Sequence, residues 1–193
     1  MHQRKDYFYR KAKKDAYLAR SVYKLAEMDE KFKLFHEGQV LLDLGTSPGS
    51  WVQYLLRRYA SQIKIVGVDC QESLVPESEA FHFVRADLLT LDPSVLRARY
   101  AEYDGVLSDA APNTSAIRWC DASRSFELCL KGWRLAEELL KRGGFFVCKI
   151  FQGEEVKGFQ RDLQNAFESV RLFKPRGSRK ESPEIYLVAI GKK

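Results

Sequence analysis

The feature that most constrains the fold of this chain is an alternation between short apolar runs and longer stretches with helical spacing. The apolar runs cover residues 39–45, 64–69, 80–87, 103–109 and 143–151. Short runs that are apolar throughout are typical of strands buried on both faces of a parallel sheet, with helices as the connections. We therefore expect an α/β fold in which helices cover both faces of a mostly parallel sheet.

The rest of the chain completes this α/β pattern. Residues 21–32 have helical spacing through Val22, Leu25, Met28 and Phe32. Further helices are predicted at 50–60, 122–141 and 155–166, and further strands at 168–173 and 184–191. The 193 residues contain no repeat and no low-complexity linker, which predicts one domain over residues 1–193.

Positive charge gathers at two places in the chain, whose net charge is +6. The first basic cluster consists of Arg4, Lys5, Arg10, Lys11, Lys13, Lys14, Arg20 and Lys24. The second basic cluster consists of Arg171, Lys174, Arg176, Arg179 and Lys180. Two solvated basic faces would be the simpler explanation, but aromatic residues are interleaved with the first cluster, and this mixture suits nucleic acid better. Residues 1–36 are therefore predicted to be a mainly helical segment that contacts RNA or DNA.

Composition disfavours several classes of protein. No apolar run is long enough for a membrane span, and the N-terminus lacks the apolar segment of a signal peptide. These features predict a cytoplasmic protein with no membrane partner. The four cysteines show no CxxC spacing and are interpreted as reduced, and the histidines are scattered, so we expect no metal site. Nothing indicates an obligate partner subunit, which favours a monomer.

Parallel sheets of this kind bind ligands at the carboxyl ends of their strands. The stretch DLGTSPGSW follows the first strand, where Gly45 and Gly49 permit close approach of a ligand to the backbone. Pro48 lies inside this turn, which makes it a poor site for a dinucleotide pyrophosphate. Asp69 is suitably spaced to bind ribose hydroxyls, and Asp87 could accept from an adenine amino group. Each acid alone would be a cap or turn residue, but the ordered set indicates S-adenosylmethionine.

Stretches from nearly the whole chain resemble the FtsJ-type RNA ribose 2′-O-methyltransferases, in the order and spacing of that family. They are ARSVYKL (19–25), LLDLGTSPGSWVQ (41–53), VLSDAAPN (106–113), VCKIFQGE (147–154) and SPEIYLVAIGKK (182–193). The resemblance implies a Rossmann-like class I methyltransferase fold, a seven-stranded mostly parallel sheet and S-adenosylmethionine as methyl donor. Ser50 is a departure, since the family commonly has a second glycine there, and residues 70–80 match no family motif.

The family's Lys-Asp-Lys-Glu tetrad falls on Lys24, Asp109, Lys149 and Glu184. The resemblance further implies that S-adenosylmethionine is contacted by Gly49, Trp51, Asp69, Asp87 and Asp109. Lys149 stands out even without the family, because it interrupts the apolar run FFVCKIF and lysine is seldom buried without a partner. Taken one by one, the simpler alternatives are an edge-strand lysine reaching solvent for Lys149, a helix surface charge for Lys24 and a strand-start acid for Glu184.

Two roles are open for Lys149 in the methylation of a ribose hydroxyl. A general base must be neutral, a form that burial in the apolar strand and the nearby charge of Lys24 would favour. A cationic lysine would instead stabilise the developing alkoxide, and the two carboxylates of the tetrad would favour that form. Positioning of the hydroxyl against the methyl group is expected to contribute more than either role.

The expected substrate is RNA, because the ribose 2′-hydroxyl is absent from DNA. Base methylation is disfavoured: SDAAPN differs from the Asn/Asp-Pro-Pro-aromatic segment of adenine N6 enzymes, and no cysteine follows a proline as in cytosine C5 enzymes. A chain of this length resembles the bacterial family members that act on a uridine of large-subunit ribosomal RNA, with the assembled large ribosomal subunit as a candidate substrate. Relatives that act on tRNA are usually longer, and tRNA is the alternative substrate.

Three other functions are compatible with a sheet of this kind. An NAD-dependent oxidoreductase would need a pyrophosphate turn, which TSPGS does not supply. A small-molecule O-methyltransferase is disfavoured by the basic, aromatic N-terminus and by the lack of metal-ligand histidines. A non-catalytic RNA-binding ribosome assembly factor on the same fold predicts a broken tetrad or cofactor turn, whereas both are intact in this sequence.

Overall fold

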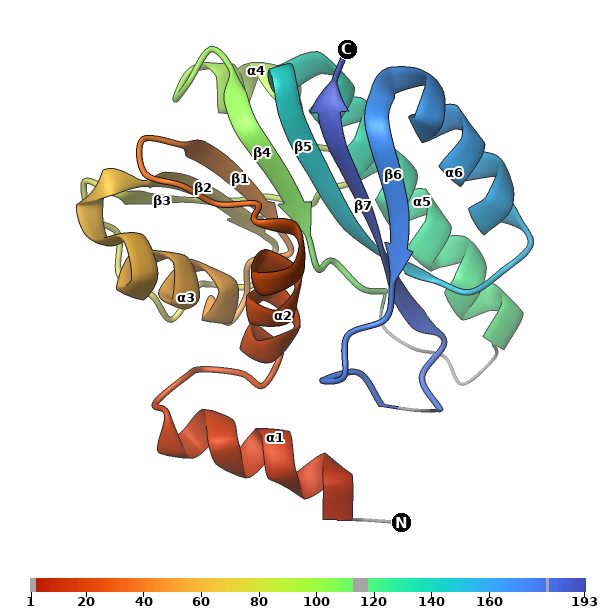
Figure 1. The fold of residues 1–193 in the computed structure, drawn as a ribbon. Coiled ribbons are helices and arrows are strands. Elements are labelled where there is room, and N and C mark those ends of the chain that lie inside the picture. Colours follow the sequence, from red (N-terminus) through yellow and green to blue (C-terminus); the bar gives the residue numbers. More distant parts are fainter. Residues whose placement is uncertain (1–2, 113–117, 180) are drawn as a thin grey trace.

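The computed structural model describes residues 3–112, 118–179 and 181–193. Asn113 of the VLSDAAPN stretch and Lys180 of the second basic cluster lie outside the described residues, as do the side chains of Arg4 and Lys5. The described part consists of a seven-stranded sheet with helices against both of its faces (Figure 1). This arrangement confirms the α/β architecture that the alternating pattern predicts.

The strands are β1 (Val40–Leu44), β2 (Lys64–Asp69), β3 (Phe81–Arg85), β4 (Tyr103–Ser108), β5 (Leu140–Phe151), β6 (Phe167–Phe173) and β7 (Glu184–Lys192). Their order in the sheet is β3-β2-β1-β4-β5-β7-β6, and β1 to β5 run parallel to one another. The last strand in the chain, β7, is antiparallel to both of its neighbours. The expected mostly parallel sheet is confirmed, although β5 begins at Leu140, earlier than its apolar run predicts.

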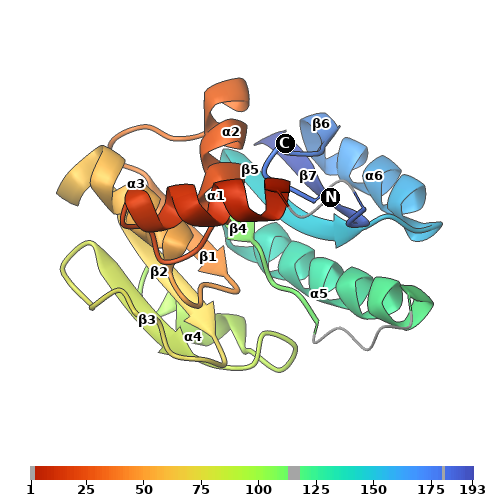
Figure 2. The same ribbon diagram turned by 90° about the horizontal axis from the view of Figure 1, so that it is seen from below.

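The helices are α1 (Gln3–Lys14), α2 (Val22–Phe32), α3 (Ser50–Tyr59), the 3₁₀ helix η1 (Ala60–Gln62), α4 (Pro93–Arg97), α5 (Arg118–Leu139) and α6 (Glu155–Ala166). One face of the sheet is covered by α2 and α3, and the other by α4, α5 and α6 (Figure 2). Helix α1 lies beyond the end of the sheet toward which β4 points (Figure 1). Across the described ranges, no helix combines the length and apolarity needed to span a membrane.

The sequence pattern did not predict α4, which is too short to show helical periodicity. Its start follows from local chemistry, because the side chain of Asp92 accepts a hydrogen bond of 2.8 Å from the amide of Ser94 and Pro93 occupies the first turn. Leu96 anchors the helix in the core.

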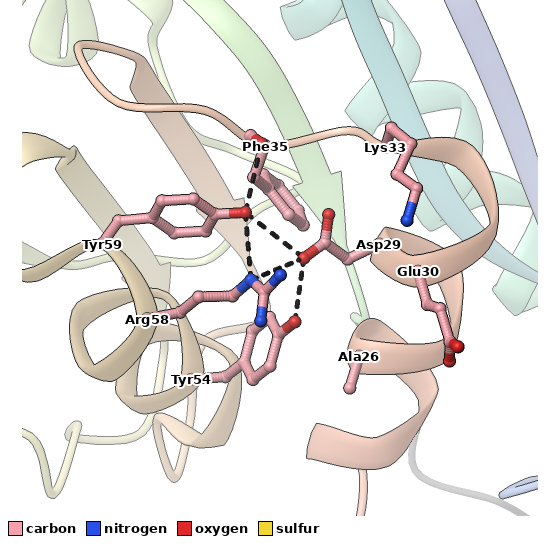
Figure 3. Close-up of a pocket in the computed structure, with 8 residues that line it drawn as sticks. All are labelled: Ala26, Asp29, Glu30, Lys33, Phe35, Tyr54, Arg58 and Tyr59. Atoms are coloured by element: carbon pink, nitrogen blue, oxygen red, sulfur yellow. Dashed lines mark hydrogen bonds and ion pairs between the residues drawn. The ribbon is translucent and has the colours of Figure 1, made fainter.

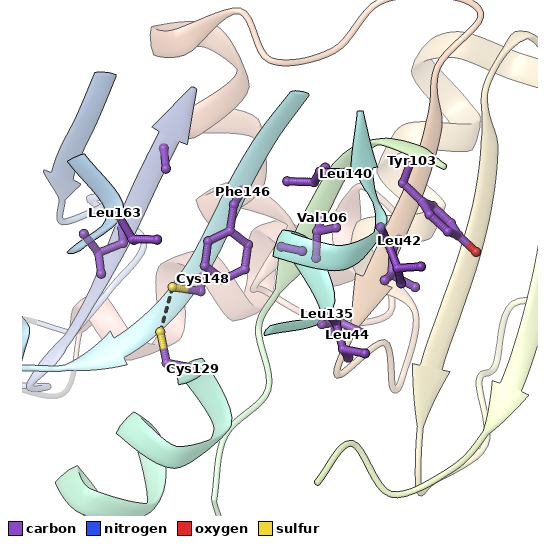
Figure 4. Packing of buried hydrophobic residues seen from close by; sticks show 14 of the residues in the cluster. Leu42, Leu44, Tyr103, Val106, Cys129, Leu135, Leu140, Phe146, Cys148 and Leu163 are labelled. Atoms are coloured by element: carbon purple, nitrogen blue, oxygen red, sulfur yellow. Dashed lines mark hydrogen bonds between the residues drawn. The ribbon is translucent and has the colours of Figure 1, made fainter. Parts of the chain in front are cut away.

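The core on the α4–α6 face contains aliphatic side chains from the sheet and from α5 (Figure 4). Leu42 and Leu44 of β1 are fully buried there together with Leu135 of α5. The thiols of Cys129 in α5 and Cys148 in β5 lie 2.8 Å apart, and both cysteines are free. These two cysteines therefore pack as apolar core residues.

Side chains of β5 alternate between the two faces of the sheet. Val147 belongs to the core under α2 and α3, whereas Cys148 belongs to the opposite core. By the same alternation Lys149 shares the α2/α3 face with Val147. Because β5 lies between β4 and β7, the alternative that Lys149 is an edge-strand lysine is wrong.

Candidate active site

Strand register brings the four tetrad positions to one corner of the sheet. Across the β5–β7 pair, Lys149 lies opposite Tyr186, and Glu184 is two residues away at the start of β7. Asp109 directly follows β4, the strand on the other side of β5, in which Ser108 pairs with Cys148. The fourth residue, Lys24, comes from the first turn of α2, which covers this face of the sheet. Four side chains that are far apart in the sequence thus meet at the carboxyl end of β4 and β5.

Two ion pairs hold these side chains together. The Nζ atom of Lys24 lies 2.7 Å from Oε1 of Glu184, with side-chain exposures of 8% and 13%. The Nζ atom of Lys149 lies 3.1 Å from Oδ1 of Asp109, with exposures of 7% and 17%. Lys149 also donates a hydrogen bond of 2.5 Å to the backbone carbonyl of Asp109. Both lysines are nearly buried, and each is compensated by a carboxylate. The surface-charge alternative for Lys24 is therefore wrong.

Tyr186 links the two ion pairs. Its hydroxyl donates a hydrogen bond of 2.7 Å to Oδ1 of Asp109, and the ammonium of Lys24 lies 5.9 Å from the centre of its ring. Burial, followed by the charges of Asp109 and Glu184, raises the pKa of the Tyr186 phenol well above its usual value. Sequence reasoning missed this residue, yet a signal existed: a position two residues after Glu184 in a strand lies on the same face.

The charge of Asp109 is maintained by its neighbours. Burial alone would raise the pKa of this carboxyl, but the charges of Lys149 and Lys24 and the hydrogen bond from Tyr186 outweigh it, so the pKa lies below its usual value. Asp109 is therefore an ionised acceptor at neutral pH, placed between two cations.

The loop between β6 and β7 covers the Lys24–Glu184 pair. The hydroxyl of Ser178 donates a hydrogen bond of 2.7 Å to the same Glu184 oxygen that Lys24 contacts. The amide of Arg176 donates to Glu27 of α2 at 2.7 Å, which fixes the loop against that helix. Ser178 is a second residue that sequence reasoning missed, and a serine in a loop gives no signal of this contact.

The two basic clusters approach each other at this corner. Burial and then the charge of Arg179 lower the pKa of Arg20, while Glu184 acts in the opposite direction. Arg20 belongs to the first cluster and Arg179 to the second, so one arginine from each cluster lies near Glu184 of the tetrad.

The turn after β1 has the backbone geometry that its glycines allow. Gly45 has a φ of +80°, and a Cβ atom there would lie 2.6 Å from the backbone of Ala110. Gly49 has a φ of +107°, and a Cβ atom there would lie 2.7 Å from Val75. Val75 belongs to the 70–80 segment, which sequence reasoning could not assign and which packs over this turn; the amide of Leu74 donates to the carbonyl of Pro48 at 3.0 Å.

The remaining predicted cofactor residues differ in how they are placed. Asp69 accepts hydrogen bonds of 2.9 Å from the amides of Ser47 and Gln71, so it fixes the turn to the end of β2. Asp87 is exposed beyond β3 and accepts from the amide of Leu89 at 2.9 Å. The structure therefore brings Asp69 to the glycine turn, whereas Asp87 lies on the adjoining rim of the sheet.

Trp51 is buried, with its ring 6.1 Å from that of Tyr186, and its indole nitrogen donates to the carbonyl of Ser21 at 3.0 Å. Ser50, the departure from the family pattern, is also buried, and its hydroxyl lies 2.8 Å from the hydroxyl of Ser21. These contacts join the glycine turn after β1 to the start of α2, three residues before Lys24. The side chain that replaces a glycine is thus used in a contact between the two parts of the site.

Asp43 of β1, which begins the DLGTSPGSW stretch but received no role from the sequence, tests whether the site suits S-adenosylmethionine. It is 1% exposed, and both carboxylate oxygens are buried with no hydrogen-bond partner in the described part of the chain. Burial, then the charge of Asp109, with a smaller contribution from Asp69, raises its pKa to about 7. The neighbouring carboxylates of Asp43 and Asp69 make this end of the sheet complementary to a cation, and S-adenosylmethionine carries a sulfonium and an ammonium. The residues therefore fit this donor.

A second polar cluster lies between α2 and α3 (Figure 3). The buried carboxylate of Asp29 accepts from the hydroxyls of Tyr54 at 2.8 Å and Tyr59 at 3.4 Å, and its oxygen lies 3.4 Å from Nε of Arg58. These side chains, with Lys33, border a pocket of about 480 Å³. Nothing in this cluster resembles the tetrad, because it holds no buried lysine. Elsewhere too, no three His, Cys, Asp or Glu side chains of the described ranges are grouped to hold a metal.

A sheet of this order, with an antiparallel β7, a glycine turn after β1 and acids at the ends of β1, β2 and β4, defines a Rossmann-like class I methyltransferase fold. The chain belongs to the FtsJ-like methyltransferase family, whose model matches residues 17–192. The family resemblance predicted from the sequence motifs is thus confirmed.

Relatives with curated names are similar along nearly their whole length. The ribosomal RNA large subunit methyltransferase E of Bdellovibrio bacteriovorus is 41% identical over 192 residues, covering 98% of this chain and 97% of that protein. The protein of the same name from Desulfatibacillum aliphaticivorans is 40% identical over 189 residues, covering 98% and 91%. A crystal structure of a protein assigned as a ribosomal RNA methyltransferase from Plasmodium falciparum is 27% identical, with a TM-score of 0.81 and coverage of 91% and 98%.

Proposed function

We propose that this protein transfers a methyl group from S-adenosylmethionine to the 2′-hydroxyl of a ribose, on a uridine, in large-subunit ribosomal RNA. Residues 1–193 would act as one methyltransferase domain, with residues 1–36 as its RNA-contacting segment. The names of the similar proteins support ribosomal RNA as the substrate class. The observation that carries the proposal is the pair of buried lysines that meet two carboxylates at the carboxyl end of β4 and β5.

Lys149 acts as a cation in this proposal. Both contacts of its Nζ atom are to acceptor oxygens, the carboxylate and the carbonyl of Asp109, and such partners suit an ammonium. The ammonium would stabilise the alkoxide that develops as the ribose hydroxyl loses its proton to water. Asp109 and Tyr186 hold the lysine in place, while the Lys24–Glu184 pair fixes the adjacent wall of the site.

The cofactor supplies an electrophilic methyl group bound to a sulfonium. Asp69 and the turn containing Gly45 and Gly49 would hold its adenosine part, with Asp87 on the adenine side and Trp51 supporting the turn from beneath. Asp109 closes the site between cofactor and ribose, since its carboxylate contacts Lys149 and its backbone follows β4. Positioning of the hydroxyl against the methyl group is the main contribution of these residues.

Methyl transfer from radiolabelled S-adenosylmethionine tests this function. Large ribosomal subunits that lack their own modifications, the matching naked RNA and bulk tRNA are offered side by side to the purified protein. Label in large-subunit RNA that survives alkali as a dinucleotide is expected, since a 2′-O-methyl group blocks cleavage. Label confined to tRNA would contradict ribosomal RNA as the substrate but would agree with ribose methylation. Cofactor binding without any label would favour a non-catalytic assembly factor.

The cofactor assignment has its own variant. Asp69→Ala removes the acceptor at the end of β2 and is expected to weaken S-adenosylmethionine binding by about tenfold or more, measured by calorimetry. Glu72→Ala is a matched control, because Glu72 is an exposed acid three residues away that pairs with Arg85. An unchanged affinity in the Asp69 variant would contradict its assignment.

A further inference from the structure

Helix α1 has two different faces. Toward the body of the protein it directs Phe8, whose ring lies 5.6 Å from that of Tyr23, and the buried Ala12. On either side of this packed face it exposes Tyr7 and Tyr9, with 59% and 51% of their surface accessible. Arg10, Lys13 and Lys14 are exposed on the same helix. Large aromatic rings that stay in water beside cations are a feature that packing does not require.

The segment directly after α1, residues 15–18, is held by two side chains of α3. The guanidinium of Arg57 donates hydrogen bonds to the carbonyls of Asp15 and Ala16 at 2.8 and 2.7 Å. Gln53 donates to the carbonyl of Ala16 at 2.9 Å and accepts from the amide of Leu18 at 3.0 Å. Carbonyls that follow a helix have no partner within it, so these contacts satisfy them and fix the direction of α1.

A second set of contacts joins α1 to α2 through Tyr23, the residue before Lys24. The Tyr23 hydroxyl donates to the carboxylate of Asp15 at 2.8 Å. The ammonium of Lys11 lies 4.5 Å from the centre of the Tyr23 ring. Helix α1 is therefore connected both to the helix that begins at the cofactor turn and to the helix that carries Lys24.

We infer that α1 is a pre-oriented arm for single-stranded RNA, and that Arg57 and Gln53 of α3 form the clamp that sets its direction. The inference rests on the proposed function and names the RNA-reading element of that site. Exposed cations would contact phosphates, and the exposed tyrosines offer faces on which unpaired bases stack, a combination typical of single-strand binding. A fixed arm binds more tightly than a loose one, because less freedom is lost on binding.

Helix α1 lies outside the part of the chain that the family model matches. The matching family model begins at residue 17, after the end of α1. The sequence predicts nucleic-acid contact for residues 1–36 as a whole. Only the structure separates the exposed tyrosines and cations of α1 from its packed residues Phe8 and Ala12, and only the structure shows what holds the helix.

The clamp is tested with Arg57→Ala, Arg57→Lys and the matched control Arg58→Ala. Arg58 is the next residue and carries the same charge, but it pairs with Asp29 instead of α1. Hydrogen exchange of residues 3–18 is measured together with the affinity for a short fluorescein-labelled single-stranded RNA, without cofactor. Arg57→Ala is expected to accelerate exchange and weaken RNA binding by about tenfold. Arg57→Lys should show the same changes to a smaller extent, because an ammonium can still donate to a carbonyl but lacks the planar two-nitrogen geometry of the guanidinium. Arg58→Ala should match the wild type in both.

The exposed face is tested separately. Tyr7→Ala combined with Tyr9→Ala is expected to weaken RNA binding, whereas the corresponding phenylalanine variants keep it, because stacking needs the ring and not the hydroxyl. Lys14→Ala should reduce the dependence of log affinity on log salt by about 0.7 if its phosphate contact is lost. Cofactor affinity should be unchanged in all of these variants.

Several outcomes would overturn the inference. Faster exchange in Arg57→Ala without weaker RNA binding would remove α1 from the RNA site. Weaker binding without faster exchange would make Arg57 a direct RNA contact and remove the clamp. Normal affinity for naked RNA with a raised KM for assembled subunits would identify a protein surface as the occupant. RNA binding is measured without cofactor, so it does not depend on methyl transfer. If the wild-type protein transferred no methyl group to ribosomal RNA, the proposed function would be contradicted but the RNA-binding role of α1 would not.

Discussion

Two carboxylates on the α2/α3 side of the sheet have similar surroundings, but their cationic partners differ in the free-energy cost of desolvation. Asp109 and Asp29 both accept a hydrogen bond from a tyrosine hydroxyl and both face a cation, and α2 contributes to each cluster. The cation beside Asp29 is Arg58, whose side chain is 59% exposed. The cations around Asp109 are the nearly buried Lys149 and Lys24.

This difference separates a structural cluster from a chemical one. An exposed arginine beside Asp29 keeps its hydration, so the Asp29 cluster joins α2 to α3 at little cost. A buried lysine pays a desolvation penalty that its ion pair offsets only in part, and an apolar side chain would fill the space as well. Lys149 and Lys24 are therefore expected to be retained for function and not for stability.

The largest expected effect is that of Lys149→Ala. Removal of the ammonium should slow methyl transfer by about 10³-fold, as for other groups that stabilise developing charge, while cofactor affinity stays the same. Single-turnover transfer of radiolabel measures the rate, and Lys141→Ala, at the start of the same strand, is the control. Lys149→Arg should keep part of the activity if the role is electrostatic. Near-normal turnover of Lys149→Ala would remove the contrast between the two clusters.

The second prediction concerns Asp43, a buried carboxyl group that is influenced by the charge of Asp109 in the tetrad. Its folded pKa of about 7 lies above its unfolded value of 3.8. The stability it contributes is therefore present below pH 3.8 and is lost as pH rises through about 7, by at most about 4 kcal/mol. Asp43→Asn cannot ionise, so its free energy of unfolding should lack this slope in urea titrations without cofactor. Equal slopes in wild type and variant would show that Asp43 is not the responsible group.

The third prediction concerns the structural cluster. Asp29→Ala removes the acceptor of two tyrosine hydroxyls and should lower the free energy of unfolding by about 2 kcal/mol, with the rate of methyl transfer unchanged at a temperature where the variant is folded. Glu30→Ala is the control, since Glu30 is exposed on the same helix and should change stability little. A large fall in rate would mean that the Asp29 cluster also serves the reaction.

The smallest expected effects come from removing one tyrosine hydroxyl from each cluster. This pair of variants compares the two clusters most directly, because the same chemical group is deleted in both. Tyr186→Phe and Tyr54→Phe each delete one hydroxyl that donates to a carboxylate. Both variants should lose about 1 kcal/mol of stability. Only Tyr186→Phe should slow methyl transfer, several-fold, because Asp109 then holds Lys149 less firmly. Equal rates in the two variants would contradict the positioning role of Tyr186.

Sequence patterns predicted the sheet well because each strand carries its own signal. The strands β1, β2 and β4 were located by apolar runs that end in acids, and the bounds agree closely. The tetrad positions came from the family motifs and not from periodicity. A short helix such as α4 was missed because its start depends on one capping contact.

Other features had no local signal. Asp29 reads as an ordinary charge on a helix surface, and its burial depends on Tyr54 and Tyr59 of α3. The side chain of Asp43 lies within the predicted motif, but its missing hydrogen-bond partners appear only when the neighbouring strands enclose it. The same holds for Arg57, an exposed basic residue until its contact with the end of α1 is seen.

The sequence by itself determined the succession of strands and helices along the chain, the mostly parallel sheet and the family to which the chain belongs. It could do so because alternation and short motifs are local properties of the polypeptide. The tertiary structure decided which charges are buried, which of them meet and which direction α1 takes. Burial and pairing depend on residues far apart in the chain, such as Lys24 with Glu184 and Asp15 with Arg57. Their energies are set by distance and solvent exposure in space, and no local pattern encodes either quantity.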